Sequence, residues 1–299
     1  MGLFSTIKNI FFTGSLLIMS NLVVAKSCDK IEIPINFDKF GLPHLTLQIN
    51  DQPYRALFDL GSASGIHLPP RLISGFKLLS YTGKTVNSVN ITGKTNVDKV
   101  FIISKLTANC MAFEQISGLT LSPWSASAGE MSPEQIAQEK QLKEQPVIGR
   151  GFFIGKTIIV DYANNKLVVQ NKAAKANDTT PSFPFKVEPE GITLALKTPH
   201  KTYKMSLDTG ASISMLIPAK MSPKESLKSC AIDFGPQMKC QKLDSPLKVG
   251  GKVSYSSDVI LFPIDPRFKM DGLLGADFFH AFAIEIDFAK GHLNLRKNM

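Results

Sequence analysis

Two short turns in the sequence each carry an aspartate directly after a strand-like run. The first reads Phe58-Asp59-Leu60-Gly61-Ser62 and the second Leu207-Asp208-Thr209-Gly210-Ala211. The glycine two positions after each acid permits a tight backbone, and the N–H groups crowded there can bind the carboxylate. Two carboxylates brought into contact must share a proton, and such a pair holds one acid and one base. The turns therefore predict acid–base hydrolysis by Asp59 and Asp208.

An internal repeat explains how one chain can supply both turns. Val147-Ile148-Gly149 recurs as Leu273-Leu274-Gly275 after 126 residues, without a gap in the sequence that follows. The Asp turns match at an offset of 149, so the first half holds 23 additional residues. We place this insertion at about residues 117–145, where Ser132-Pro133-Glu134-Gln135 predicts the start of a helix. Each half thus combines one Asp turn with a later apolar-apolar-Gly step.

The elements around these motifs are predicted to be strands. Runs rich in β-branched and aromatic residues recur in both halves and are bounded by Gly, Pro, Asn or Lys. They cover residues 44–50, 54–58, 97–103, 157–160, 192–196, 203–207, 258–262 and 283–286. Ser222-Pro223-Lys224-Glu225 predicts a short helix. We therefore expect an all-β fold of two β-barrel lobes, related by an internal pseudo-twofold duplication, with few short helices.

Other repeated residues have simpler explanations than catalysis. Asp161 and Asp287 each precede a turn with a lysine, and we expect them to cap backbone N–H groups. His67 is expected at the rim of the cleft rather than as a general base. The phenylalanines that follow each apolar-apolar-Gly step are expected in the core: Phe152, Phe153, Phe278 and Phe279.

The first 25 residues predict export. Lys8 precedes an apolar stretch that ends in Val23-Val24-Ala25, which has the small-residue spacing of a signal-peptidase site. An uncleaved N-terminal anchor is the alternative. The organisation that follows is a signal peptide at 1–25, a first lobe at 26–170, a polar linker at 171–184 and a second lobe at 185–299. We expect a secreted or periplasmic protein.

Export favours disulfides for the four cysteines. Cys230 and Cys240 are close in sequence and form the simplest pair, which leaves Cys28 with Cys110. The cysteines lack a Cys-x-x-Cys spacing and the five histidines are scattered, so no metal site is expected.

The chain is basic, but its charge pattern does not indicate a nucleic-acid partner. Loss of the first 25 residues removes only Lys8, which leaves 33 basic and 25 acidic residues and a net charge of +8. The basic residues form no long run and no stripe with aromatic residues. We therefore expect a basic surface on a monomer that binds no nucleic acid and has no stable membrane insertion.

With these residues in view, the chain resembles the aspartic peptidases, and the short retropepsin-like unit in particular. The resemblance rests on Asp59-Leu60-Gly61-Ser62 with Val147-Ile148-Gly149, and on Asp208-Thr209-Gly210-Ala211 with Leu273-Leu274-Gly275. It implies two retropepsin-like lobes and an exported aspartic endopeptidase that cleaves a peptide or protein substrate. Asp59 and Asp208 would activate water without a metal, a covalent intermediate or a cofactor, and Gly61, Ser62, Thr209, Gly210 and Ala211 would support the turns.

The resemblance also implies two features that the sequence meets only in part. A flap over the substrate is expected between the first Asp turn and its glycine step, at Asn90, Ile91, Thr92 and Gly93. The family has Thr or Ser where this chain has Leu60, and that hydroxyl locks the two turns together. Two alternatives therefore stay open: a non-catalytic peptide-binding protein of the same fold, which Leu60 supports, and a scaffold of the cell envelope, which the basic charge and the insertion support.

Overall fold

The protein is all-β in the part that the computed structural model describes, which comprises residues 28–49, 52–89, 95–121, 133, 137, 144–172, 180–232 and 239–298. Two short α-helices, α1 (Pro70–Ile73) and α3 (Ala276–Ala281), and two 3-10 turns, η1 (Arg150–Phe153) and η2 (Pro218–Lys220), accompany the strands. The expected signal peptide lies outside the described residues. Most of the expected helix in the insertion also lies outside them, although Pro133 and Ala137 are helical.

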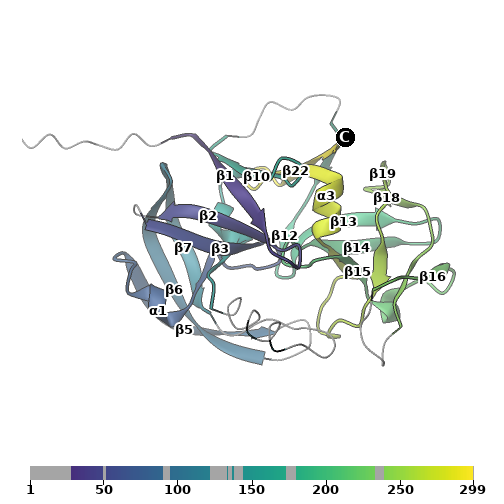
Figure 1. Cartoon of the computed structure of the whole chain (residues 1–299), viewed down its shortest axis with the longest axis horizontal. Helices are drawn as coiled ribbons and strands as arrows, with labels where there is room; N and C mark the ends of the chain where they lie inside the picture. Colours follow the sequence, from purple (N-terminus) through teal and green to yellow (C-terminus); the bar gives the residue numbers. More distant parts are fainter. Residues whose placement is uncertain are drawn as a thin grey trace, which may run out of the picture.

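The larger sheet has 13 strands in the order β11-β23-β22-β9-β10-β1-β2-β3-β8-β4-β7-β6-β5. In chain order its strands are β1 (Lys30–Phe37), β2 (Pro43–Ile49), β3 (Gln52–Asp59), β4 (Ile66–Leu68), β5 (Leu79–Val89), β6 (Thr95–Ala108), β7 (Met111–Thr120), β8 (Val147–Gly149), β9 (Thr157–Asp161), β10 (Lys166–Gln170), β11 (Ser182–Pro184), β22 (Phe282–Asp287) and β23 (His292–Lys297). Figure 1 shows β2, β3 and β5–β7 gathered on one side of the molecule.

The smaller sheet has 10 strands, nine of them in the order β16-β17-β20-β15-β21-β14-β13-β18-β19, and β12 pairs with β13. These are β12 (Val187–Glu188), β13 (Gly191–Lys197), β14 (Thr202–Leu207), β15 (Ser214–Leu216), β16 (Leu227–Ser229), β17 (Gln241–Leu243), β18 (Leu247–Val249), β19 (Val253–Tyr255), β20 (Val259–Leu261) and β21 (Gly272–Leu274). In Figure 1, β16, β18 and β19 lie on the side of α3 that is opposite β5–β7.

Both sheets use the same pairing around an Asp turn. β3 leads into the first turn and pairs in parallel with β8, while β14 leads into the second and pairs in parallel with β21. The strand after each turn is antiparallel to the glycine strand and parallel to a further strand. The history of duplication remains an interpretation of the sequence.

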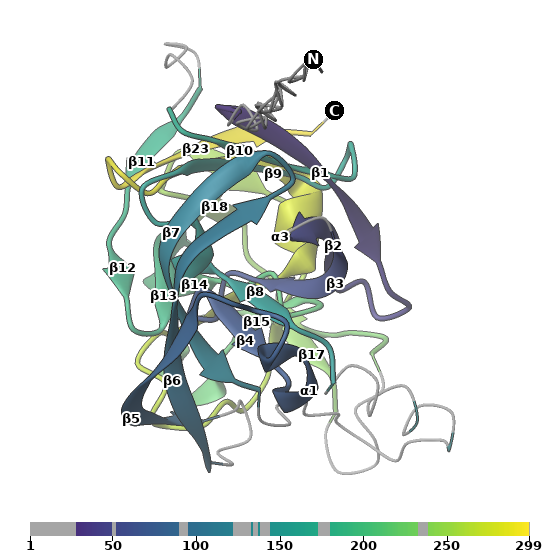
Figure 2. The ribbon, with the colours of Figure 1, turned by 90° about the vertical axis from the view of Figure 1, so that its left-hand side faces the viewer.

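The two halves of the chain are joined by a continuous sheet, which differs from two separate barrels. β9 of the first half pairs antiparallel with β22 of the second, with Ile284 opposite Val160 and Asp287 opposite Thr157. Both strands are almost entirely buried. Such apolar runs need cover on both faces, and each half supplies part of it to the other. Figure 2 shows β1, β9, β10 and β23 together at one end of the molecule.

The linker prediction is corrected at its end. Within the expected linker 171–184, residues 182–184 form β11, which pairs with β23. Phe183 is 7% exposed, and burial of this apolar side chain stabilises the position of the segment in the sheet. The four phenylalanines expected in the core are buried, at 3% exposed or less.

Both expected disulfides are present. Cys28 is bonded to Cys110 with a Cα–Cα distance of 5.5 Å, and Cys230 to Cys240 at 5.2 Å. Two disulfides indicate folding in an oxidising, extracellular type of compartment. Among the described residues there is no helix long and apolar enough to cross a membrane.

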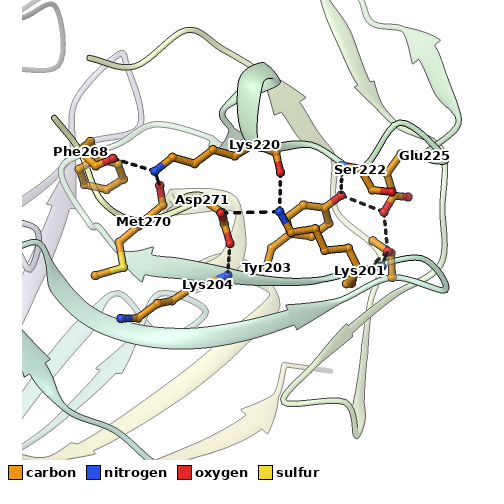
Figure 3. A network of polar contacts seen from close by, with 10 residues as sticks. Lys201, Tyr203, Lys204, Lys220, Ser222, Glu225, Phe268, Met270 and Asp271 are labelled. Carbon is orange, nitrogen blue, oxygen red and sulfur yellow. Dashed lines mark hydrogen bonds and ion pairs between the residues drawn. The ribbon is translucent and has the colours of Figure 1, made fainter. Parts of the chain in front are cut away.

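The expected helix at Ser222 is a turn instead, and Figure 3 shows why. In a capping box Glu225 would bond the Ser222 N–H, but that group donates to the Tyr203 hydroxyl at 3.0 Å. The buried Glu225 carboxylate accepts hydroxyl hydrogen bonds from Thr198, Tyr203 (2.9 Å) and Ser245 (2.9 Å). Tertiary partners thus override the local helix signal.

The two repeated turn aspartates behave as expected. Asp161 accepts the Asn164 N–H at 3.2 Å and its side-chain amide at 2.8 Å. Asp287 accepts the N–H groups of Ala289 and Lys290, both at 3.0 Å. They cap turns, in agreement with the sequence.

Candidate functional site

The two Asp turns meet face to face. Asp59 is the last residue of β3 and Asp208 directly follows β14. A Cβ placed on Gly61 would lie 2.7 Å from Cγ of Asp208, and one on Gly210 would lie 2.9 Å from Cγ of Asp59. Each glycine therefore lacks a side chain because the opposite carboxyl occupies that space. The sequence expectation that the turns come together is met.

Backbone N–H groups orient both carboxyls. Asp59 Oδ1 accepts the N–H of Gly61 at 2.8 Å and of Ser62 at 3.2 Å. Asp208 Oδ1 accepts the N–H of Gly210 at 2.8 Å. These bonds stay within each turn, so each acid is fixed by its own loop.

The two carboxyls form a pair that can share one proton. Burial, and then the negative charge of Asp59 and a hydrogen bond between the two side chains, raise the pKa of Asp208 well above its ordinary value of 3.8. A neutral Asp208 can donate to an ionised Asp59, which removes the repulsion between two adjacent charges. The pair can therefore donate to one atom of a bound molecule and accept from another.

Thr209 locks the second turn to the first. Its hydroxyl accepts the Leu60 N–H at 2.8 Å and donates to the Phe58 carbonyl at 2.7 Å. Leu60 is completely buried and has no hydroxyl to return these bonds to the second turn. The lock between the turns is therefore one-sided, as the sequence predicted.

The apolar-apolar-Gly steps hold the chain that follows each turn. Gly149 donates its N–H to the Gly65 carbonyl at 3.0 Å, and Gly275 donates to the Ser214 hydroxyl at 3.1 Å. A Cβ at Gly149 would lie 2.8 Å from the Ser62 carbonyl oxygen, and one at Gly275 would lie 2.8 Å from the Ala211 carbonyl oxygen. Only glycine lets the two segments pass this closely.

Sequence reasoning missed Arg150, which is buried under the first turn at 2% exposed. Its guanidinium donates to the carbonyls of Leu60 (3.3 Å) and Gly61 (2.6 Å). It also donates to the carbonyls of Glu188 (2.9 Å) and Pro189 (2.7 Å) in the second half. The available signal was an arginine directly after Val147-Ile148-Gly149, where the repeat has Ala276.

The structure also assigns a partner to His67. Its Nε2 lies 2.7 Å from the Ser62 hydroxyl oxygen, one turn away from Asp59. Burial lowers the pKa of His67, while the charges of Asp59 and Asp98 oppose that shift. The imidazole therefore contacts the turn that holds Asp59, whereas the sequence predicted only a position at the rim of the cleft.

The expected flap residues Asn90, Ile91, Thr92 and Gly93 lie outside the described residues. The strands on both sides of this segment are described: β5 and β6 pair antiparallel up to Val89 and Thr95.

The described part of the chain groups no three His, Cys, Asp or Glu side chains into a possible metal site. Two cavities lie away from the Asp pair. One, of about 570 Å³, is lined by side chains such as Tyr54, Phe76 and Leu106, and the other, of about 280 Å³, includes Thr193 and Tyr203.

Comparison with known proteins gives a fold but no family. No family model matches the chain, and no curated protein matches it. Among solved structures the chain is similar to basic 7S globulin from soybean, with a TM-score of 0.54, 13% identity and coverage of 90% of this chain and 95% of that chain. Conglutin gamma, a unique basic 7S globulin from lupine seeds, gives a TM-score of 0.53 and 12% identity over 90% and 95% of the two chains.

These neighbours correct the functional expectation. Both are basic 7S globulins and neither is named as a peptidase, which contradicts the prediction of an exported aspartic endopeptidase. The resemblance of the motifs to the aspartic peptidases stays a prediction. At 12–13% identity the likeness establishes only that this chain has the fold of the two globulins.

Proposed function

We propose that this protein binds an extended peptide segment at its paired Asp turns and does not cleave it. The observation that carries the proposal is the contact between the two turns, in which each glycine packs on the opposite carboxyl. This contact places one proton donor and one acceptor where the two halves of the chain meet. A peptide backbone offers the matching groups, a carbonyl and an N–H, at regular intervals.

The one-sided lock favours binding over catalysis. Thr209 bonds the backbone on both sides of Asp59, but Leu60 provides nothing comparable for Asp208. Catalysis requires reacting groups held within fractions of an ångström, whereas binding tolerates a less rigid pair. Leu60 instead contributes to the buried core.

The surrounding features extend this proposal. The motifs support membership of the retropepsin-like group, as a member that binds rather than cuts. The two disulfides support a secreted or periplasmic protein, and the basic net charge of +9 supports a monomer, because identical basic chains repel. The broader expectation that the chain is an enzyme stays a prediction.

A peptide assay tests the proposal. The oxidised protein is incubated with a mixed-sequence peptide library from pH 3 to pH 8; retained peptides and any products are identified by mass spectrometry. We expect retention of intact peptides, and a loss of at least tenfold in affinity in Asp59→Asn and Asp208→Asn. The matched control is Asp258→Asn, whose side chain is 58% exposed and pairs with Lys242.

Two results would overturn the proposal. Peptide cleavage that disappears in Asp208→Asn would show a catalyst. Absence of peptide retention by the folded wild-type protein at every pH would remove the binding function and favour the scaffold alternative. Competition of retained peptides by a statine-type peptide, which presents a hydroxyl to both carboxyls, would place the ligand at the pair.

A further inference from the structure

The cavity of about 570 Å³ lies in the first half, among β2, β3, β6 and the segment 75–78 that follows α1. Figure 1 shows α1 on the same side of the molecule as β5 and β6. Cavities of roughly 300–1,000 Å³ with an apolar lining and a few polar groups are the usual binding sites of small molecules. The floor of this cavity is apolar and consists of four side chains that are 5% exposed or less: Ile49, Phe76, Ile103 and Leu106.

The walls of the cavity are fixed by contacts within the protein. The Leu78 carbonyl accepts the Ser104 N–H at 3.1 Å, which ties the segment after α1 to β6. The rings of Tyr54 and Phe76 contact each other, with 5.5 Å between their centroids. A Cβ on Gly75 would lie 3.4 Å from the Tyr54 hydroxyl oxygen, so glycine keeps space open beside that hydroxyl. The cavity is therefore formed before a ligand arrives, which lowers the entropic cost of binding.

Two exposed lysines, Lys77 and Lys105, line the mouth of the cavity. Glu114 is opposite Lys105 in the register of β6 and β7 and is exposed as well. Within the part of the chain that the structure describes, neither lysine takes part in an ion pair and the Tyr54 hydroxyl makes no hydrogen bond. The mouth therefore offers two positive charges and one hydroxyl next to an apolar floor.

We propose that this cavity binds a free amphipathic carboxylate with one apolar tail. The tail covers the floor and displaces water from it, and the carboxylate binds Lys77, Lys105 and the Tyr54 hydroxyl. The charges determine the class of ligand. A neutral apolar molecule would leave both ammonium groups without a partner, and a small inorganic anion would leave the floor exposed to water.

This site is separate from the paired Asp turns. Tyr54 and Asp59 both belong to β3 and are five positions apart, which corresponds to about 16 Å along a strand. Neither turn lines the cavity. Binding of the carboxylate therefore does not depend on the peptide binding proposed above.

Amide NMR of the oxidised, 15N-labelled protein tests the site with decanoate below its micellar concentration. We expect saturable shifts at the amides of Tyr54, Phe76 and Leu106, and none with acetate at the same concentration. Decanol, which has the tail without the charge, should bind about threefold or more weakly. Each CH₂ removed from the tail should weaken binding by up to about fourfold, the factor for a fully buried CH₂.

Variants at the mouth test the role of charge. Lys77→Gln and Lys105→Gln should each weaken decanoate binding by about twofold to fivefold, as for exposed charge pairs, and leave decanol binding unchanged. Leu78→Asp places a carboxylate at a side chain that is 53% exposed, and it should weaken decanoate binding more than Leu78→Asn does. The matched control is Lys248→Gln, at an exposed site of the smaller sheet, which should bind decanoate like the wild-type protein.

Any of three results would overturn the proposal. These are the absence of saturable decanoate binding, equal affinity for decanol and decanoate, and an unchanged decanoate affinity when Lys77 and Lys105 are both replaced by glutamine. Shifts with phosphatidylglycerol vesicles but not with decanoate would also overturn it, because they would indicate a membrane surface as the ligand. Asp208→Asn should bind decanoate with wild-type affinity. Failure of peptide retention with intact decanoate binding would contradict the proposed function alone.

Discussion

Ser62 and His67 form a direct hydrogen-bonded pair, with 2.7 Å between the hydroxyl oxygen and Nε2. The serine belongs to the loop that holds Asp59, and the histidine belongs to β4. The pair therefore connects the Asp turn to the sheet beneath it through an imidazole whose pKa is lowered by burial.

This connection predicts a loss of stability in mild acid. Burial lowers the pKa of His67 below its ordinary value of 6.5, so the unfolded chain binds a proton that the folded protein excludes. His67 therefore contributes fully to the free energy of unfolding above about pH 6.5, where it is neutral in both states. This contribution declines as the pH falls toward the lowered pKa. His67→Gln should flatten this decline in urea unfolding. His200→Gln, at an exposed site, is the control and should retain the wild-type slope.

For Asp208 we expect the opposite pH dependence of stability. Its raised pKa means that the folded protein holds a proton that the unfolded chain releases above its ordinary value of 3.8. The contribution of Asp208 to the free energy of unfolding is therefore fully present below pH 3.8. It declines as the pH rises toward the raised pKa of the folded protein. Asp208→Asn cannot release the proton, so its unfolding free energy relative to wild type should increase with pH across this range. A difference that does not vary with pH would contradict the shared proton.

Loss of the Thr209 hydroxyl should destabilise the protein measurably. Thr209→Val leaves the buried Leu60 N–H and Phe58 carbonyl without their partner, and each buried unpaired group costs ~1–3 kcal/mol. Guanidinium unfolding at neutral pH measures the change. Thr202→Val, on an exposed site of β14, should change stability by less than about 0.5 kcal/mol. Equal effects of the two substitutions would argue against the lock.

The two disulfides should contribute unequally. Chain entropy predicts about 4 to 5 kcal/mol for Cys28–Cys110, which are 82 residues apart. The same relation predicts about 3 kcal/mol for Cys230–Cys240, at a separation of 10. The double Cys→Ala variants, compared by chemical unfolding, should follow this order. The reverse order would show that native contacts, rather than loop length, determine the contribution.

The sequence predicted the features that depend on local pattern. The predicted β-strands, both disulfides and the meeting of the Asp turns follow from alternation, cysteine count and an internal repeat. The helix expected at Ser222 failed because Tyr203, distant in sequence, takes the N–H that a capping box would use. Propensity describes only neighbours along the chain, so it cannot include such a competitor.

The contacts of Arg150 could not be predicted from the sequence for a related reason. The carbonyls that it bonds lie about 90 residues before it and about 38 after it. A single arginine after a glycine step carries no pattern that identifies backbone partners so far away. The joint sheet of β9 and β22 escaped prediction similarly, because the repeat shows that the two strands are alike but not that they pair.

The pairing of β9 with β22 also affects how the molecule comes apart. The hydrogen bonds between these strands and the apolar cluster that spans both halves unite them into one cooperative unit. A protease that nicks the chain between the halves would therefore release no free fragment under native conditions. Separately produced halves would each expose a sheet edge that only the other half can cover.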